Sequence, residues 1–365
     1  MKTDRRRFVA GVGASLSVLA MPRGTKAYTA GGNASAMPGE GTILVGADYY
    51  PDQTPEELWA DDARMMAEMG LTVVRMAEFA WGLMEPVEGQ YHFEWLRRSV
   101  DMLHKAGIQT ILGTPSAAPP PWLTTKYPEV FEKNANGTML GPEGRRFTCP
   151  TNKRYRDLSL KVATATAKNF ANTPGVVGWQ IDNELTLGDS QRCYCTYCQA
   201  GFQDWLRAKY QSLEKLNAAW GTVFWSQTYS DFNQIPVPLP SGGAPNPGMA
   251  LDYDRYQSAA NVGFLDVQLR MLRTECPKHF VTTNNVAAVD AIDGWDLYRQ
   301  LDFASTDNYP GFIAVYAAQG GAAISIPLDQ LASVVSWGLD MTRSAKDGKP
   351  FFVMEQQSGK AGQNF

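Results

Sequence analysis

Two glutamates follow short apolar runs in distant parts of the chain. The run 176–181 ends at Asp182-Asn183-Glu184, and the run 350–354 ends at Glu355. This change is expected where a buried strand leaves the interior and its carboxyl end opens into a site. Retaining glycoside hydrolysis needs two carboxyl groups about 5–5.5 Å apart, one to protonate the leaving oxygen and one to attack the anomeric carbon. The pair predicts this chemistry, whereas a lone glutamate at a strand end is more often a solvated loop residue or a cap.

Strands and helices are predicted to alternate along the chain. Short apolar runs predict seven strands, at about 43–48, 71–76, 108–112, 176–181, 280–283, 301–305 and 351–354. Longer segments predict helices at about 54–69, 93–105, 154–169, 199–209, 253–274 and 328–345. This βαβ repetition implies an α/β fold with a parallel sheet or barrel, whose strand ends carry the catalytic residues. Glu184 follows the fourth predicted strand and Glu355 the seventh, so a (β/α)8 TIM barrel is one strand short.

The N-terminus resembles an export signal. Asp4-Arg5-Arg6-Arg7-Phe8-Val9 is similar to the twin-arginine pattern, and an apolar run to about Met21 follows it. That run is too short to anchor the chain stably in a bilayer. We expect a signal peptide and flexible N-terminus over 1–36, cleaved between Ala27 and Ala36, and a catalytic domain over 37–365. The mature protein would be periplasmic or secreted, without a membrane partner. The alternative is a basic N-terminal tail.

Composition favours one large globular unit. The 365 residues carry 33 Lys and Arg against 37 Asp and Glu, without a basic stripe, so nucleic acid is not expected as a partner. Aromatic residues make up 11% of the chain, which suits a sugar-binding protein.

Four of the five cysteines form the most specific local motif. Cys193-x-Cys195-x2-Cys198 follows Glu184 closely, and Cys149 lies before the preceding helix. Four thiolates at such spacings suit a tetrahedral structural Zn²⁺, whose closed shell leaves no position for water or substrate. Two disulfides are the alternative in an exported protein, although the crowded spacing strains such pairing. Cys276 stands apart, and we expect it to be a buried free thiol.

From about Gly46 onward the chain resembles glycoside hydrolase family 42, the β-galactosidase family. The resemblance is carried by the stretches 46–51 (GADYYP), 75–81 (RMAEFAW), 179–184 (WQIDNE), 219–222 (AWGT) and 353–356 (VMEQ). It implies a (β/α)8 barrel and a retaining exo-β-galactosidase, with Glu184 as general acid/base and Glu355 as nucleophile. The implied substrate is a β-galactoside or related oligosaccharide. Some members also carry a four-cysteine zinc at the matching positions.

The same resemblance implies roles for other side chains. Arg75 matches a position beside the nucleophile, where a guanidinium would keep the carboxylate charged, although a structural salt bridge is the alternative. The matching sugar-contacting residues are Arg145, Asn183, Trp225 and Tyr309. Asn183 would suit the 2-hydroxyl, and Arg146 replaces Arg145 if the alignment slips by one. Either aromatic residue could instead belong to the core.

The chain departs from the family at its C-terminal end. It stops at Phe365, ten residues after Glu355, whereas family members continue through an eighth strand and helix and a trimerisation domain. We therefore expect an incomplete barrel here, and a homotrimer only in a full-length form. Two alternatives stay open: a non-catalytic sugar-binding remnant, or the same mechanism acting on α-L-arabinopyranosides or β-D-fucosides.

Overall fold

A computed structural model describes residues 44–142, 144–186, 192–240, 243–286, 291–311 and 328–357. The signal peptide predicted over 1–36, and its boundary with the catalytic domain, lie outside these ranges. Among the described residues, no helix is both long and apolar enough to cross a membrane.

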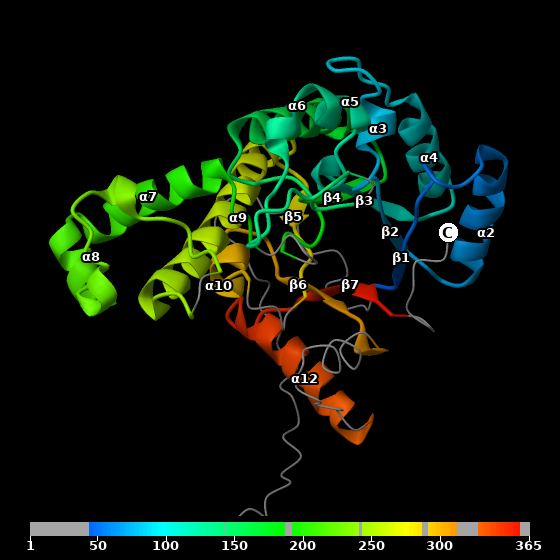
Figure 1. Cartoon of the computed structure of the whole chain (residues 1–365). Coiled ribbons are helices and arrows are strands. Elements are labelled where there is room, and N and C mark those ends of the chain that lie inside the picture. Colours follow the sequence, from blue (N-terminus) through cyan, green and yellow to red (C-terminus); the bar gives the residue numbers. More distant parts are fainter. Residues whose placement is uncertain are drawn as a thin grey trace, which may run out of the picture. The chain divides into compact units, whose positions relative to one another are not determined.

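Seven short strands form the framework of the described chain (Figure 1). They are β1 (Gly46–Asp48), β2 (Val73–Met76), β3 (Gln109–Gly113), β4 (Val176–Gln180), β5 (Phe280–Thr282), β6 (Ser305–Asn308) and β7 (Phe352–Gln356). Strands β1 to β5 pair in chain order as one parallel sheet, and β6 pairs with β7 as a second parallel pair. The main-chain bond from Asp307 N to Asn285 O, at 3.1 Å, joins β6 to the segment that follows β5.

All seven predicted strands are present, but the sixth is displaced. The prediction placed it at 301–305, whereas β6 begins at Ser305 and runs to Asn308. The apolar residues Leu301, Phe303 and Ala304 are buried in the turn before the strand, which explains why the apolar pattern was misleading.

The helices that follow the strands are mostly those predicted. The six expected helices are α2 (Trp59–Glu68), α4 (Glu94–Lys105), α6 (Lys153–Phe170), α7 (Thr196–Tyr210), α9 (Pro247–Glu275) and α12 (Leu328–Ser344). Short helices not predicted are α3 (Trp81–Met84), α5 (Pro121–Lys126), α8 (Leu213–Trp220) and α10 (Gly294–Tyr298), with 3-10 turns at Glu56–Leu58, Pro115–Ala117, Pro128–Val130, Phe224–Ser226 and Phe232–Gln234. Helix α9 begins six residues before the predicted start, because Asn246 caps it by accepting hydrogen bonds from Gly248 N and Met249 N.

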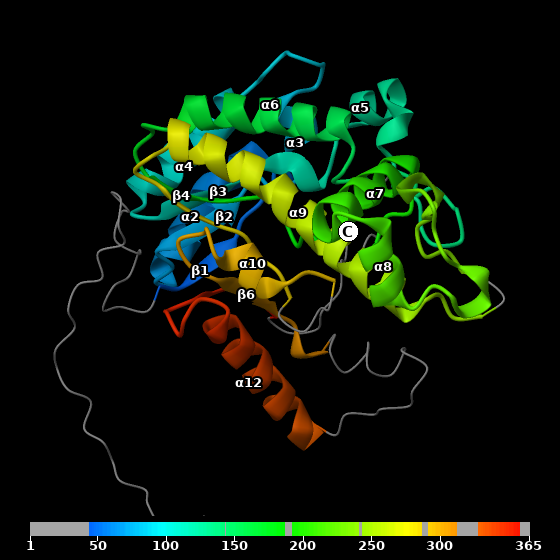
Figure 2. The ribbon, with the colours of Figure 1, turned by 90° about the vertical axis from the view of Figure 1, so that its left-hand side faces the viewer.

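One face of the large sheet packs against helices. Alternate strand residues such as Val74, Leu112 and Trp179 join a buried core to which α2, α4, α6 and α9 contribute. Helices α6 and α9 lie side by side (Figure 2), where the rings of Tyr155 and Phe264 stack with centroids 5.3 Å apart. These helices therefore cover and support one face of the sheet.

The opposite face of the strands carries an apolar cluster and, further along the strands, the polar residues of the site. The cluster is buried and consists of Val73, Ile111, Phe280 and Phe303. Gly178 lies opposite Phe280, whose ring would be 2.3 Å from a Cβ at position 178, so only glycine fits there. Two residues further along β2 and β4, the same face carries Arg75 and Gln180. A packed apolar layer therefore supports a polar layer near the carboxyl ends of the strands.

Candidate active site and cysteine cluster

The two glutamates singled out in the sequence lie together at the carboxyl ends of their strands. Glu184 follows β4 and Glu355 lies within β7, and both are buried. One oxygen of each carboxyl group lies within 4.8 Å of the other, and Asp307 of β6 contributes a third carboxyl group to the same cluster. This separation is nearer the about 5–5.5 Å of retaining glycosidases than the about 6.5–9.5 Å of inverting ones.

Glu355 is surrounded by hydrogen-bond donors. Its Oε1 accepts from Arg75 Nη2 at 2.7 Å and from Asn284 Nδ2 at 3.0 Å, and its Oε2 accepts from the Tyr309 hydroxyl at 2.6 Å. Burial works to raise the pKa of Glu355, but Arg75, together with Tyr309, outweighs burial and holds that pKa below its usual value. Glu355 is therefore ionised at neutral pH, the state in which a carboxylate can act as a nucleophile.

Glu184 lies in a different environment. Its Oε2 is 2.5 Å from Arg145 Nη2 and 3.3 Å from Asn183 Nδ2. Burial raises the pKa of Glu184, the Arg145 guanidinium opposes that rise, and the charge of Glu355 adds to it, so the net shift is upward. Two neighbouring carboxyl groups thus have pKa values moved in opposite directions, which is the arrangement that separates a proton donor from a nucleophile.

The main chain before and at Glu184 adopts an unusual conformation. Asp182 and Glu184 have φ angles of 57° and 44°, in the left-handed region that non-glycine residues seldom occupy. Asp182 is held there by its side chain, which accepts from Ser116 Oγ at 2.5 Å and pairs with Arg146. Arg146 also donates to the main-chain oxygen of Leu185. These buried contacts hold Asp182 and Leu185, which lie on either side of Glu184, in place.

Arg145 and Arg146 therefore point to different partners. Arg145 contacts the Glu184 carboxylate and is about one third exposed, whereas Arg146 is buried and pairs with Asp182. Of the two arginines considered in the sequence, Arg145 lies where it could contact a substrate.

Most of the predicted site residues are gathered here. Arg75, Arg145, Asn183 and Tyr309 each contact one of the two glutamates. Trp225 is placed differently: it lies in the turn Phe224–Ser226 that follows α8, is 76% exposed, and stacks on Phe224 with centroids 5.2 Å apart. Helix α8, which precedes this turn, lies away from β4 and β7 (Figure 1), and among the described residues no hydrogen bond or ring contact joins Trp225 to either glutamate.

Two residues of the site were not predicted. Asn284, just after β5, donates to Glu355, and Asp307 of β6 accepts from Asn284 Nδ2 at 2.8 Å. Burial raises the pKa of Asp307 well above its usual value, and Glu355 adds to that rise. The signal available in the sequence was the polar run Thr282-Thr283-Asn284-Asn285 at the end of a predicted strand, the same kind of change that identified Glu184.

The four cysteines form a second, separate buried cluster. Cys149, Cys193, Cys195 and Cys198 have sulfur atoms that all lie within 4.8 Å of one another. Cys149 Sγ is 3.4 Å from Cys198 Sγ and 3.6 Å from Cys195 Sγ, far beyond the about 2.05 Å of a disulfide. A tetrahedral ion with metal–sulfur bonds of about 2.3 Å would place sulfurs about 3.8 Å apart, so the cluster could hold a metal ion. Cys276 is buried outside this cluster, with its sulfur 3.6 Å from Ala167 O, as expected.

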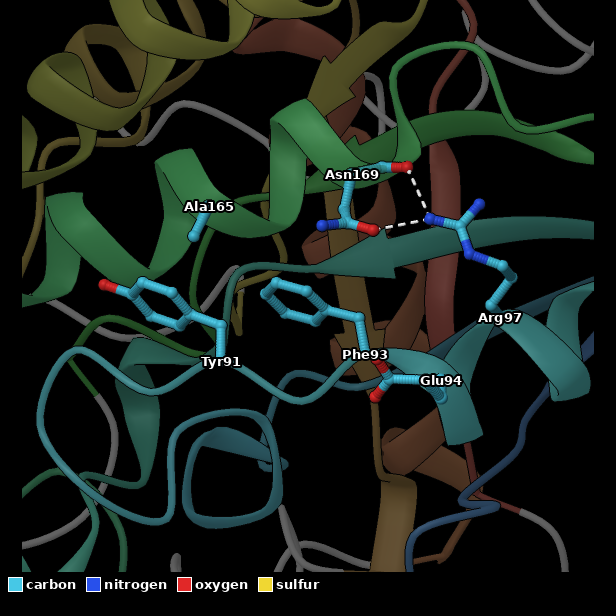
Figure 3. Close-up of a pocket in the computed structure, with 6 residues that line it drawn as sticks. All are labelled: Tyr91, Phe93, Glu94, Arg97, Ala165 and Asn169. Atoms are coloured by element: carbon cyan, nitrogen blue, oxygen red, sulfur yellow. Dashed lines mark hydrogen bonds between the residues drawn. The ribbon is translucent and has the colours of Figure 1, made fainter.

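A surface cavity of about 340 Å³ lies elsewhere, beside α4 and α6 (Figure 3). Tyr91 and Phe93 line it with parallel rings 5.9 Å apart, and Arg97 donates to the Asn169 side chain at 2.5 Å. Neither glutamate lines this cavity, so it is not the site described above.

The chain is similar to known β-galactosidases over most of its length. The glycoside hydrolase 42 family model, described as β-galactosidase, matches residues 48–364. A β-galactosidase from Thermus thermophilus is 38% identical over 317 residues, which cover 87% of this chain and 49% of that relative. The chain thus spans about half the length of this relative.

Solved structures have the same fold. A β-galactosidase from the haloarchaeon Halorubrum lacusprofundi aligns with a TM-score of 0.82 at 35% identity, covering 86% of this chain and 47% of that one. A β-galactosidase from the psychrophile Marinomonas ef1 aligns with a TM-score of 0.79 at 33% identity, covering 86% and 48%. The α/β fold with a parallel sheet or barrel, predicted from the alternation of strands and helices, and the (β/α)8 TIM barrel implied by the resemblance are confirmed. The chain belongs to glycoside hydrolase family 42, the β-galactosidase family.

Proposed function

We propose that this chain carries the catalytic site of a retaining exo-β-galactosidase, which releases terminal non-reducing β-D-galactosyl residues. The single observation that carries the proposal is the close pair Glu184 and Glu355, whose surroundings move their pKa values in opposite directions. Membership of the family supports galactose as the glycone, and the short carboxyl separation supports retention of configuration.

In the first step, a carboxylate oxygen of Glu355 attacks the anomeric carbon while the bond to the leaving oxygen breaks. Glu184 transfers its proton to that oxygen, so the aglycone departs as an alcohol and the sugar is joined to Glu355 as an ester. In the second step, Glu184 takes a proton from water, whose oxygen attacks the same carbon and releases Glu355. Arg75 and Tyr309 suit this cycle because both stabilise the free carboxylate.

Sugar recognition is assigned to the residues that border the glutamates. Arg145 is partly exposed beside Glu184, and Asn183 offers an amide next to the same carboxyl group, which suits contacts with sugar hydroxyls. Trp225 stays a predicted subsite residue on the resemblance alone.

The direct test is hydrolysis of p-nitrophenyl β-D-galactoside by the 365-residue chain, with proton NMR of the first anomer released. The proposal predicts β-galactose as the initial product, and α-galactose would contradict the retaining mechanism. The matching α-L-arabinopyranoside and β-D-fucoside test the glycone. Galactose binding by calorimetry without turnover of any of the three would instead indicate a non-catalytic sugar binder.

We propose that the cysteine cluster holds a structural Zn²⁺. The sulfur spacing and full burial of Cys149, Cys193, Cys195 and Cys198 support it, because zinc favours four thiolates in a closed tetrahedral shell. Such a site would join the loop that carries Cys149 to the start of α7 and stabilise both. It would take no part in the chemical steps.

We also propose twin-arginine export to the periplasm or the medium, on the basis of residues 4–21. Changing Arg5 and Arg6 to lysine should leave the precursor in the cytoplasm, and unchanged export would contradict the proposal.

A homotrimer is proposed only for a longer form, on the resemblance alone. Sedimentation velocity of that form would test it, and a monomer would contradict it.

A further inference from the structure

One side chain contacts both glutamates, and it belongs to neither of their strands. Asn284 follows β5 and is fully buried. Its Oδ1 accepts the main-chain N–H of Glu184 at 3.0 Å, and its Nδ2 donates to Glu355 Oε1 at 3.0 Å. The amide therefore bridges the main chain of Glu184 and the carboxylate of Glu355, the two residues whose carboxyl separation sets the stereochemistry of the reaction.

The orientation of the Asn284 amide is determined by its partners. A main-chain N–H can only donate, so the atom facing Glu184 N must be the amide oxygen. The nitrogen then faces three acceptors: Glu355 Oε1, Asp307 Oδ2 at 2.8 Å and Asn183 Oδ1 at 2.9 Å. A flipped amide would face Glu184 N with a donor and Glu355 with an oxygen, which would lose contacts on both sides.

These contacts fix the main chain of Glu184 and stabilise the negative charge of Glu355. The bond to Glu184 N fixes the main chain of a residue whose φ is 44°, a conformation that needs external support. The bond to Glu355 favours the ionised carboxylate, because a hydrogen bond donated to the charged form stabilises that form. Asn284 can do both because an amide carries an acceptor and a donor on one rigid plane.

We propose that Asn284 is a positioning residue that sets the spacing of Glu184 and Glu355 and helps to keep Glu355 ionised. This rests on the proposed function, since spacing matters only if the two glutamates share a substrate. Asn284 takes no part in the bond changes in this account; it acts through the main chain of Glu184 and the carboxylate of Glu355.

Several charged or titratable groups face Glu355 from other elements and influence the same equilibrium. They are Asp48 of β1, Arg75 of β2, Arg145, Glu184 after β4, Asp307 of β6 and Tyr309 after β6. Glu78, after β2, pairs with the same Arg75 guanidinium as Glu355. The test must therefore leave all of these residues in place and change the amide alone.

The experiment compares Asn284→Ala and the isosteric Asn284→Asp with the wild-type chain. The control is Asn261→Asp, a buried asparagine whose amide donates to Gln257 O within α9. Glutamate side chains are labelled with ¹³C at the carboxyl carbon, and Glu355→Gln identifies the signal of Glu355. That signal is titrated by NMR, and circular dichroism checks folding.

The Glu355 pKa should rise by about one pH unit in Asn284→Ala, since a donor to the carboxylate is lost. It should also rise in Asn284→Asp, because a carboxyl group replaces the donor, and it should not move in Asn261→Asp. The kcat/KM for p-nitrophenyl β-D-galactoside should fall by about 10–100-fold in both Asn284 variants.

An unchanged Glu355 titration in folded Asn284→Ala would overturn the proposal, whatever the activity. If the titration shifts but the wild-type chain cleaves no glycoside, the proposed function fails while the link from Asn284 to Glu355 stands. If Asn284→Asp does not fold, Asn284→Ala alone decides the outcome.

Discussion

The guanidinium of Arg75 lies 2.7 Å from the carboxylate of Glu355, from Nη2 to Oε1, although the two residues are 280 positions apart. The same guanidinium is 3.1 Å from Asp48 and 3.0 Å from Glu78, and its Nη1 donates to Gln180 at 3.1 Å. One buried cation therefore faces three carboxyl groups from different parts of the barrel. Its contact with Glu355 therefore joins strand β2 to the proposed nucleophile.

Replacing Arg75 with methionine should move the acidic limb of the pH–rate profile. Arg75 lowers the Glu355 pKa, so its loss raises that pKa, and the low-pH loss of activity should begin about 1–3 pH units higher. The measurement is kcat/KM for p-nitrophenyl β-D-galactoside against pH. The matched control is Arg64→Met, because Arg64 is exposed and pairs with Glu68 on α2. An acidic limb that stays in place would show that Arg75 has only a structural role.

Arg145 and Arg146 should have separable effects when each is changed to alanine. Arg146→Ala leaves Asp182 buried without its cation, so it should reduce the free energy of unfolding by about 3–5 kcal/mol. Arg145→Ala should change stability little. Because Arg145 lowers the Glu184 pKa, its loss should shift the basic limb of the pH–rate profile upward. Urea unfolding and pH–rate profiles measure the two effects, and a reversed pattern would exchange the assigned roles.

Much of this site could be predicted because its main residues stand at strand ends. Glu184 and Glu355 each follow an apolar run, and the change from apolar to polar side chains marks where a buried strand reaches the open edge of a barrel. Arg75 stands among apolar residues of β2 and was predicted from the resemblance. Their chemical roles came from the resemblance, since the pattern alone does not distinguish a nucleophile from a proton donor.

Asp307 escaped prediction for a physical reason. Strand β6 reads Ser305-Thr306-Asp307-Asn308, four polar residues without an apolar pattern. It is buried because its side chains bond to the neighbouring chain: Ser305 Oγ lies 2.9 Å from Thr282 Oγ1, and Thr306 Oγ1 donates to Asn285 O at 3.1 Å. Strand formation here depends on tertiary partners that local sequence does not reveal.

The main-chain conformation at Asp182 and Glu184 likewise could not be predicted from the sequence. Positive φ angles at aspartate and glutamate have no sequence signature like that of glycine. They arise from Arg146 and Asn284, which lie 36 and 100 residues from their partners in this segment.

Removing a ligand of the proposed zinc site should destabilise the chain rather than change its chemistry. Cys149→Ser should lower the melting temperature and the bound metal, which elemental analysis should find at about one zinc per wild-type chain. The control is Cys276→Ser, because Cys276 lies outside the cluster. This variant should keep as much bound zinc as the wild-type chain. Wild-type protein that contains no zinc, or a Cys149→Ser variant that retains it fully, would contradict the assignment.

Glu184→Ala should affect substrates according to their leaving groups. A dinitrophenolate leaves without a proton, so formation of the galactosyl ester from dinitrophenyl β-D-galactoside should be nearly normal, while lactose hydrolysis should fall by about 10²–10⁴-fold. Stopped-flow release of dinitrophenolate and steady-state lactose hydrolysis give the two rates. Equal losses on both substrates would count against Glu184 as the acid.

The central claim, that Glu355 is the nucleophile, is tested most directly by Glu355→Ala with and without azide. The variant should be inactive towards dinitrophenyl β-D-galactoside, and azide should restore turnover by attacking the face that Glu355 no longer occupies. The account predicts α-galactosyl azide, with inverted configuration, in the NMR spectrum of the product. A folded variant that keeps its activity, or that forms only β-galactosyl azide, would contradict the account.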